Sequence, residues 1–368
     1  MRGSRLWIRL VIVLAILGSA HLYIWLRFVH ATALPAPWRT LATVAIFALA
    51  PTLPVSAFVM RGLSRRAAMP LLWLAYTWFG TAVYLLLGAA VSNLACLVID
   101  PRTAAAGALA AVGATVIYGL VHARTGPVVR RVRIPLAKLP ARAEGYTIVQ
   151  LTDVHIGPLL GETFARRVVD KVNALAPDLI VLTGDLVDGR VEELRPHVAP
   201  LGDLRARDGV FSVTGNHEYY WNADAWLAEL RALGIRVLRN ERVAIAAGFE
   251  LAGVDDSTSA KMAVGHGEDI AAALAGRDPA LPVVLLAHHP STIPRAVLAG
   301  VDLQLSGHTH GGQLLPLGWL SRLFEPHVAG LARFGATWLY VSEGTGFWGP
   351  PLRVGTSSEI AAITLTRG

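Results

Sequence analysis

Four long apolar stretches in the first third of the chain constrain its fold more than any other feature. Residues 1–125 hold a single acidic residue, Asp100, against ten arginines and no lysine. A helix needs about 20 predominantly apolar residues to cross a bilayer, and four stretches reach that length. The sequence therefore predicts four transmembrane helices, over residues 6–29, 41–60, 69–98 and 103–122.

The arginines around these stretches predict their orientation. They cluster before the first stretch, between the second and third, and after the fourth, whereas the other two loops hold only Arg27 and Arg39, then Arg102. The positive-inside rule places such clusters in the cytoplasm. We therefore expect a multi-pass protein of the cell (inner) membrane with both termini in the cytoplasm. Because the stretches contain few ionisable groups, they predict an anchor more than a transport path.

The rest of the chain, residues 126–368, has a different composition and predicts a second domain after the membrane domain of residues 1–125. It carries 23 of the 33 Lys and Arg residues and 25 of the 26 Asp and Glu residues. The high overall pI therefore belongs to the first third. A mildly acidic second domain gives no reason to expect nucleic-acid binding.

From residue 146 onward, apolar runs alternate with polar helical segments, which predicts an α/β fold. "DLIVLTGD" (178–185) is continuously apolar, as is typical of a strand buried on both faces. Five such runs end in polar side chains suited to catalysis or metal binding. These side chains are Asp153 and His155, then Asp185, then Asn216 and His217, then His288 and His289, and finally His308 and His310.

The recurrence of these polar strand ends predicts one shared site. Any one motif could be an ordinary turn or a solvated loop, but strand ends are where sites gather in layered α/β proteins. Mixed carboxylate, imidazole and amide ligands suit Mn, Fe, Zn or Co more than Ca. One carboxylate can bridge two such ions in a two-metal hydrolase.

Five motifs in order, "TDVHIG", "LTGDLVDG", "TGNHEYY", "LLAHHP" and "SGHTHGGQ", resemble those of the calcineurin-like metallophosphoesterases. The resemblance runs from about residue 130 to the C-terminus. With the apolar stretches, "VSEGTGFWGPPLRVG" resembles the membrane-associated branch of that family. The resemblance implies a four-layer α/β/β/α sandwich of two mixed sheets, which would follow the bundle of about four transmembrane helices that the apolar stretches predict.

The resemblance also implies roles for individual residues. One divalent ion would be held by Asp153, His155, Asp185 and His310, and Asp185 would bridge to a second ion held by Asn216, His288 and His308. His217 would be a catalytic acid or charge stabiliser, and Glu218 would orient its imidazole. The usual His-x-Pro pattern favours His288 over His289 as the ligand, and that choice stays open.

The function implied is a membrane-anchored, metal-dependent hydrolase of a phosphodiester or pyrophosphate bond, with a lipid-linked substrate as one interpretation. Phe347, Trp348 and Arg353 could contact such a lipid, with Arg353 meeting a phosphate. Alternatively, Trp348 packs under its loop and Arg353 is structural. Competing hypotheses are an inactive scaffold or sensor, and a transporter with a regulatory hydrolase domain. The substrate, the native metals and the oligomeric state stay open.

Overall fold

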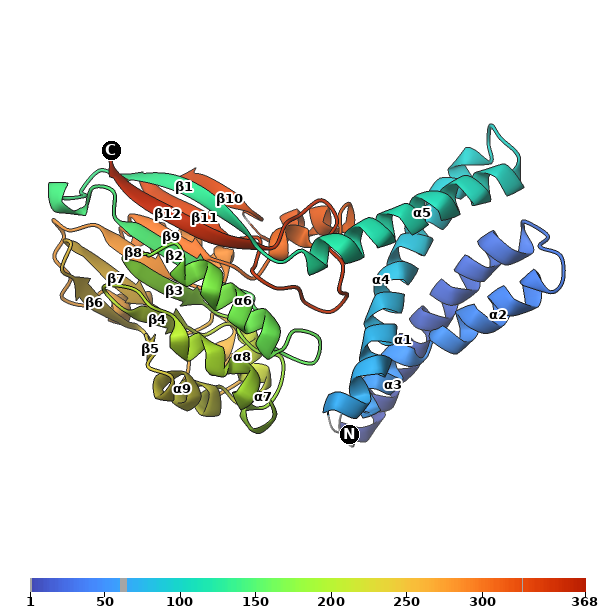
Figure 1. Ribbon diagram of the computed structural model, residues 1–368, viewed down its shortest axis with the longest axis horizontal. Helices are drawn as coiled ribbons and strands as arrows, with labels where there is room; N and C mark the ends of the chain where they lie inside the picture. The colour runs from blue at the N-terminus through green and yellow to red at the C-terminus, as the bar shows by residue number, and fades with distance from the viewer. Residues whose placement is uncertain (1, 60–64, 326) are drawn as a thin grey trace. The chain divides into compact units, whose positions relative to one another are not determined.

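The computed structural model describes residues 2–59, 65–325 and 327–368. The chain divides into two compact units, residues 1–121 with 349–352, and residues 122–348 with 353–368. The first unit is helical, and the second contains both sheets and helices (Figure 1).

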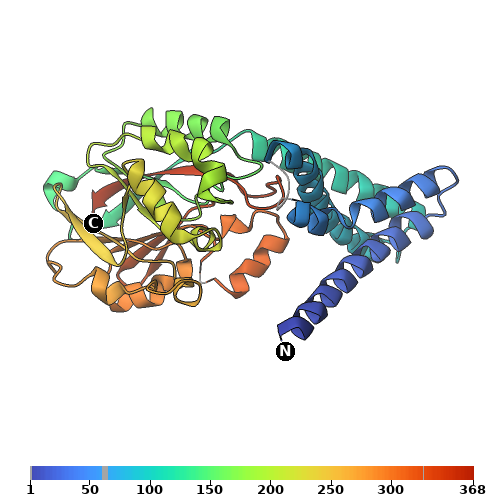
Figure 2. The same cartoon turned by 90° about the horizontal axis from the view of Figure 1, so that it is seen from below.

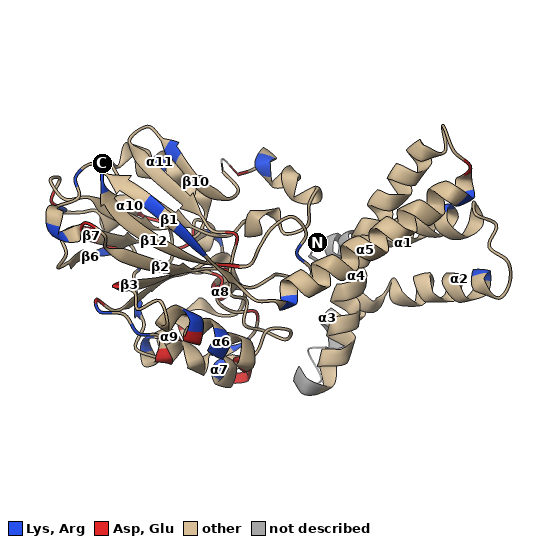
Figure 3. Cartoon of the chain, turned by 45° about the horizontal axis from the view of Figure 1, so that its top comes forward, with Lys and Arg blue, Asp and Glu red and all other residues tan. Residues whose placement is uncertain are grey.

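The N-terminal part of the chain contains four helical segments that are long and apolar enough to cross a membrane, at Val11–His30, Trp38–Ser56, Ala67–Ala95 and Pro101–Arg124. These segments match the four predicted stretches, and charged residues are sparse on their helices (Figure 3). Pro51, which lacks a backbone N–H, separates the second stretch into two helices. The elements are α1 (Arg2–Trp25), the π-helix η1 (Leu26–His30), α2 (Trp38–Leu49), α3 (Thr52–Val59), α4 (Arg65–Ala95) and α5 (Pro101–Arg124).

Polar side chains within this unit bind one another. Arg27 is buried and donates to Ser92 Oγ at 2.9 Å from Nε and 2.7 Å from Nη2. Trp78 Nε1 donates to His21 Nε2 at 3.0 Å. Internal pairing of this kind is what polar groups need in a low-dielectric, lipid-like environment.

The second unit is built on two mixed sheets of six strands each (Figure 1). The first sheet has the order β1 (Val128–Leu136), β12 (Glu359–Arg367), β2 (Thr147–Leu151), β3 (Leu179–Thr183), β4 (Val210–Val213) and β5 (Arg236–Val237). The second has the order β10 (Gly330–Phe334), β11 (Thr337–Val341), β9 (Leu303–Ser306), β8 (Val283–Leu286), β7 (Phe249–Gly253) and β6 (Glu241–Ile245).

The two sheets pack on each other with helices outside, which gives the predicted four layers (Figure 2). In β3, Leu179 and Val181 join the core between the sheets, whereas Ile180 and Leu182 join the core under the helices, as period-two alternation requires. The longer helices over the first sheet are α6 (Glu162–Asn173), α7 (Val191–Val198) and α9 (Ala223–Ala232). The second sheet packs against α10 (Ile270–Ala273) and α11 (Ile293–Leu298).

The topology brings the five polar strand ends to one edge. β2, β3 and β4 run parallel to one another, as do β8 and β9. The segments after β2 and β3 stay paired beyond the strands, because Asp153 N donates to Gly184 O at 3.0 Å and Ile156 bridges Val187. Side chains from distant parts of the sequence therefore meet at the carboxyl ends of these strands.

Candidate dimetal site

Five residues of the predicted metal site have left-handed backbone conformations. The φ angles are 50° at Asp153 and His155, 53° at Asp185, 71° at His308 and 52° at His310. For residues other than glycine such conformations cost about 1–3 kcal/mol each and cluster at functional sites. The fold therefore maintains local strain where these side chains converge.

Two glycines allow the backbone segments to approach this closely. A Cβ on Gly215 would lie 2.5 Å from Asp185 N. A Cβ on Gly307 would overlap the Asp153 carboxylate and the Thr152 side chain. Neither position can carry a side chain without displacing a proposed ligand, since both obstacles are held by the surrounding strands.

Asp153, His155 and His310 form a first buried group. Their ligand atoms lie within 4.8 Å of one another, with His155 Nε2 3.0 Å from His310 Nε2 and His310 Nε2 3.3 Å from Asp153 Oδ1. Burial, and then repulsion by His155, holds the pKa of His310 well below its usual value. A neutral imidazole beside a carboxylate is the state in which these groups bind a metal.

A second group contains Asp185, Asn216, His288 and His308. His288 Nδ1 binds Thr183 O at 2.8 Å, which leaves Nε2 3.1 Å from Asp185 Oδ2. Burial, then repulsion by His288 and His289, lowers the pKa of His308 to about 3. Asn216 Oδ1 is buried and lacks a hydrogen-bond partner among the residues that the structure describes, whereas His288 Nε2 has the Asp185 carboxylate beside it. Because an unsatisfied buried polar atom is costly, Asn216 Oδ1 fits a cation.

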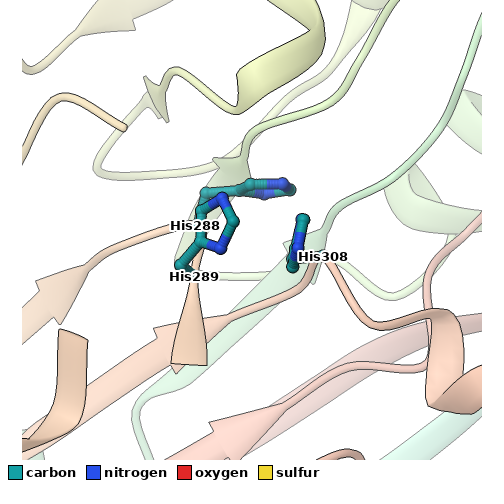
Figure 4. Close-up of side chains that lie close together, drawn as sticks. All are labelled: His288, His289 and His308. Carbon is teal, nitrogen blue, oxygen red and sulfur yellow. The ribbon is translucent and has the colours of Figure 1, made fainter. Parts of the chain in front are cut away.

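The two histidines of the doublet have different surroundings. His289 Nε2 lies 3.2 Å from Asp256 Oδ2, and its ring is tilted against that of His308 with centroids 3.7 Å apart. Figure 4 shows the rings of His288, His289 and His308 gathered together. Adjacent residues at a strand end point in opposite directions, so His288 is the member of the pair that faces Asp185.

Asp188 is a site residue that the sequence analysis missed. Its two carboxylate oxygens bind two different histidines: Oδ1 accepts from Nδ1 of His217, and Oδ2 lies 3.0 Å from Nδ1 of His155. Burial opposes its ionisation, but the two histidines outweigh it and lower the pKa of Asp188. Asp188 is the second aspartate of the quoted motif "LTGDLVDG" and lies three residues after Asp185, so the motif could have indicated it.

The structure corrects the predicted role of Glu218. Its carboxylate accepts hydrogen bonds from the backbone N–H groups of Asp185, Leu186 and Gly215 at 2.7–3.0 Å. It therefore ties the start of α8 (Asn216–Tyr220) to the loop after β3. The carboxylate that holds the His217 imidazole is that of Asp188, because its Oδ1 accepts the hydrogen bond from His217 Nδ1.

The three residues proposed to contact substrate have different environments. Phe347 is buried in the core under the helices. Trp348 is 55% exposed, and its ring lies edge-on to His217 with centroids 5.8 Å apart. Arg353 is fully buried, and its guanidinium donates to the backbone carbonyls of Glu343 and Gly346 at 2.8 and 2.6 Å. These bonds agree with the alternative interpretation, in which Arg353 has a structural role.

Replacing Arg353 with lysine should therefore lower stability more than activity. An ammonium group cannot reach the several carbonyls that the guanidinium serves, so we expect a loss of about 2–4 kcal/mol in the free energy of unfolding. Arg166→Lys, at an exposed ion pair with Glu162, is the matched control and should stay within about 0.5 kcal/mol. Unfolding would be measured by thermal denaturation of the protein in detergent. Unchanged stability with a raised KM would instead support a substrate contact by Arg353.

Residues 146–312 match the calcineurin-like phosphoesterase family. The chain is 36% identical over 239 residues to an uncharacterized metallophosphoesterase of Aquifex aeolicus, a match that covers 64% of this chain and 91% of that protein. The chain therefore belongs to the calcineurin-like metallophosphoesterase family, and its second unit contains the metallophosphoesterase domain.

Two animal relatives are similar over the same part of the chain. They are the transmembrane protein with metallophosphoesterase domain of Bos taurus, 42% identical over 263 residues, and that of Danio rerio, 40% identical over 260 residues. Each match covers 68% of this chain but only 59% and 60% of the two relatives.

Proposed function

We propose that the protein is a membrane-anchored dimetal phosphoesterase that hydrolyses a phosphodiester or pyrophosphate bond, with a lipid-linked phosphoester as its substrate. The observation that supports this most directly is the meeting of two groups of carboxylate and histidine ligands around Asp153, Asp185 and His288. The proposed ligands of one ion are Asp153, His155, Asp185 and His310. Those of the other are Asp185, Asn216, His288 and His308.

The chain's own residues have separate tasks in this proposal. Two divalent ions at these positions would supply positive charge to phosphate oxygens and lower the pKa of a water molecule. Asp188 holds the His217 ring by Nδ1, so Nε2, which lies 3.8 Å from Asp185 Oδ2, is the nitrogen that would give a proton to the leaving oxygen. Tyr220 and Trp348, both more than half exposed, flank the His217 ring and line the approach to it.

The experiment that tests this function is an assay of purified intact protein with an aryl phosphodiester and an aryl phosphomonoester in the presence of Mn²⁺. We expect hydrolysis that a chelator removes, with the diester preferred. The competing hypothesis of an inactive scaffold requires that neither compound be cleaved while Mn²⁺ still binds. The same assay with Mn²⁺, Fe²⁺, Zn²⁺ and Co²⁺ would rank the metals by the rate of hydrolysis that each supports.

A further expected result concerns the side of the membrane. By the positive-inside rule, the arginines at 61, 65, 66 and 124 predict that residues 126–368 lie on the cytoplasmic side. A C-terminal alkaline phosphatase reporter, which is active only outside the cytoplasm, should stay silent, and a fluorescent protein that folds in the cytoplasm should give a signal at the same position. The opposite pair of results would place the site on the outer side.

A further inference from the structure

One exposed apolar surface of the second unit has no part in the proposed chemistry. The 3-10 helix η7 (Leu317–Leu323) and the next residue form what is called here the η7 segment, residues 317–324. Trp319, Leu320, Leu323 and Phe324 are 57%, 56%, 74% and 81% exposed. Large apolar side chains gathered on a surface mark a contact with an apolar partner.

The base of the η7 segment is fixed to the metal-site loop. Gly318 N donates to Leu314 O at 3.1 Å, and a Cβ on Gly312 would lie 2.6 Å from Gly318 Cα. Gly312 ends the short helix η6 (His310–Gly312), which begins at a proposed metal ligand. The exposed apolar tip therefore stands on backbone that is closely packed against the candidate site.

A second connection runs from the same loop to His217. Gln313 Nε2 donates to Trp348 O at 2.9 Å, and Trp348 N donates to Gln313 Oε1 at 3.0 Å. The exposed Trp348 ring in turn lies edge-on to His217. Apolar surface thus occurs both on the η7 segment and beside the proposed catalytic histidine, and one residue, Gln313, fixes the two parts to each other.

The chemistry of the η7 segment fits the boundary between lipid headgroups and acyl chains. Residues 313–324 contain one charged side chain, the exposed Arg322. Tryptophan, leucine and phenylalanine beside an arginine are typical of surfaces that lie in this interface. The chain also supplies the membrane contact: α5 ends at Arg124 and β1 begins at Val128, so a short linker tethers the second unit to an apolar helix.

We propose that the η7 segment inserts into the interface of the membrane and presents lipid phosphoesters to the candidate dimetal site. The inference rests on the proposed function and deepens it. Trp319, Leu320, Leu323 and Phe324 would lie among the upper acyl chains, and Arg322 would bind a lipid phosphate. A headgroup held there would reach His217 along the side of Trp348.

A probe on the segment tests the insertion directly. Leu320→Cys, in full-length protein with Cys96→Ser, would carry an environment-sensitive fluorophore and be reconstituted in nanodiscs with spin-labelled acyl chains. We expect strong quenching at position 320. The control is Ala280→Cys, an exposed position before β8 and therefore at the opposite end of that strand from His288. Equal quenching at both positions, or none at 320, would overturn the proposal.

A second experiment tests the consequence for catalysis. The double variant Leu323→Gln with Phe324→Gln should lower kcat/KM for a lipid-borne phosphodiester in nanodiscs by about tenfold or more, as expected when two large apolar side chains leave the interface. Hydrolysis of a soluble aryl phosphodiester should not change. The matched control is Leu298→Gln on α11, since Leu298 is 89% exposed and lies outside the segment; it should affect neither substrate.

The outcomes separate this inference from the function on which it rests. Equal losses on both substrates, or no loss on the lipid, would overturn the role of the η7 segment while leaving the hydrolase intact. A change confined to self-association, measured by mass photometry, would assign the surface to a second copy of the chain and also overturn it. If wild-type protein hydrolyses neither substrate, the proposed function fails, and the quenching result still decides whether the segment inserts.

Discussion

Replacing Asp185 with asparagine should remove nearly all phosphoesterase activity while the chain stays folded. Asp185 Oδ2 lies 3.1 Å from His288 Nε2, and Oδ1 accepts a hydrogen bond from His217 N at 2.8 Å. Burial opposes its ionisation, but His288, His217 and His155 outweigh burial and hold the pKa of Asp185 well below its usual value. An amide keeps the shape and loses the negative charge that two cations would share.

The expected loss in kcat/KM is about 10³-fold or more, or about 4 kcal/mol of transition-state stabilisation. Metal content per chain, measured by plasma mass spectrometry, should fall with it. Asp178→Asn is the matched control at the opposite end of the same strand. Asp178 Oδ2 accepts from Thr147 N at 2.7 Å, so its loss should cost about 1 kcal/mol of stability and leave both metals bound.

The control also defines the result that would contradict the assignment. If the Asp185→Asn protein holds two metal ions and turns over near the wild-type rate, Asp185 is not shared between them. If both aspartate variants lose activity together with their thermal transitions, the loss reports unfolding and not the site. Only a selective loss at Asp185, with a retained transition, supports a bridging carboxylate.

The sequence predicted the strands that carry the site because each combines a continuous apolar run with polar residues at its end. β3 lies inside the quoted run at residues 178–185, and β8 and β9 end within the quoted motifs that carry His288 and His308. Parallel strands in a layered fold open their carboxyl ends at one edge. The gathering of these side chains was therefore predictable without knowing the order of the strands.

Other features depend on contacts between distant residues and could not be predicted in this way. β1 pairs with β12 across most of the second unit, and β6 pairs antiparallel with β7 at the edge of the second sheet. The shorter runs in β6 and β10 carry no chemical motif, so the sequence analysis did not identify them. Asp188 was missed for a related reason: its partners, His155 and His217, lie about 30 residues away on either side.

The second large effect is expected at His217, whose loss should slow hydrolysis without removing the metals. General acid catalysis contributes about 10²- to 10⁴-fold, so His217→Ala should lower kcat by that range for a poor leaving group such as an alkyl diester. A good aryl leaving group needs little protonation and should be affected less. The measurement is the ratio of the two rates in variant and wild type, with metal content determined on the same samples.

The pH dependence should show which residue sets the pKa of His217. Burial lowers this pKa, but the hydrogen bond to Asp188 and the charge of Asp185 outweigh burial and raise it to about 9 from 6.5. The protonated form is the proton donor, so the rate for a poor leaving group should fall as the pH rises through about 9. The ion pair between His217 and Asp188 should contribute its full stability below pH 6.5, and this contribution should be lost as the pH rises through about 9.

Asp188→Asn separates positioning of His217 from metal binding. The asparagine can still accept one hydrogen bond, but without its charge the alkaline fall in rate should move to lower pH. Because Asp188 also binds the proposed ligand His155, metal affinity should weaken by about 10- to 100-fold, which saturating Mn²⁺ would restore. A shifted pH profile at full metal occupancy would then belong to His217 alone. An unshifted profile in Asp188→Asn would mean that the proton comes from another group. Loss of the metals in His217→Ala would mean that His217 is a metal ligand.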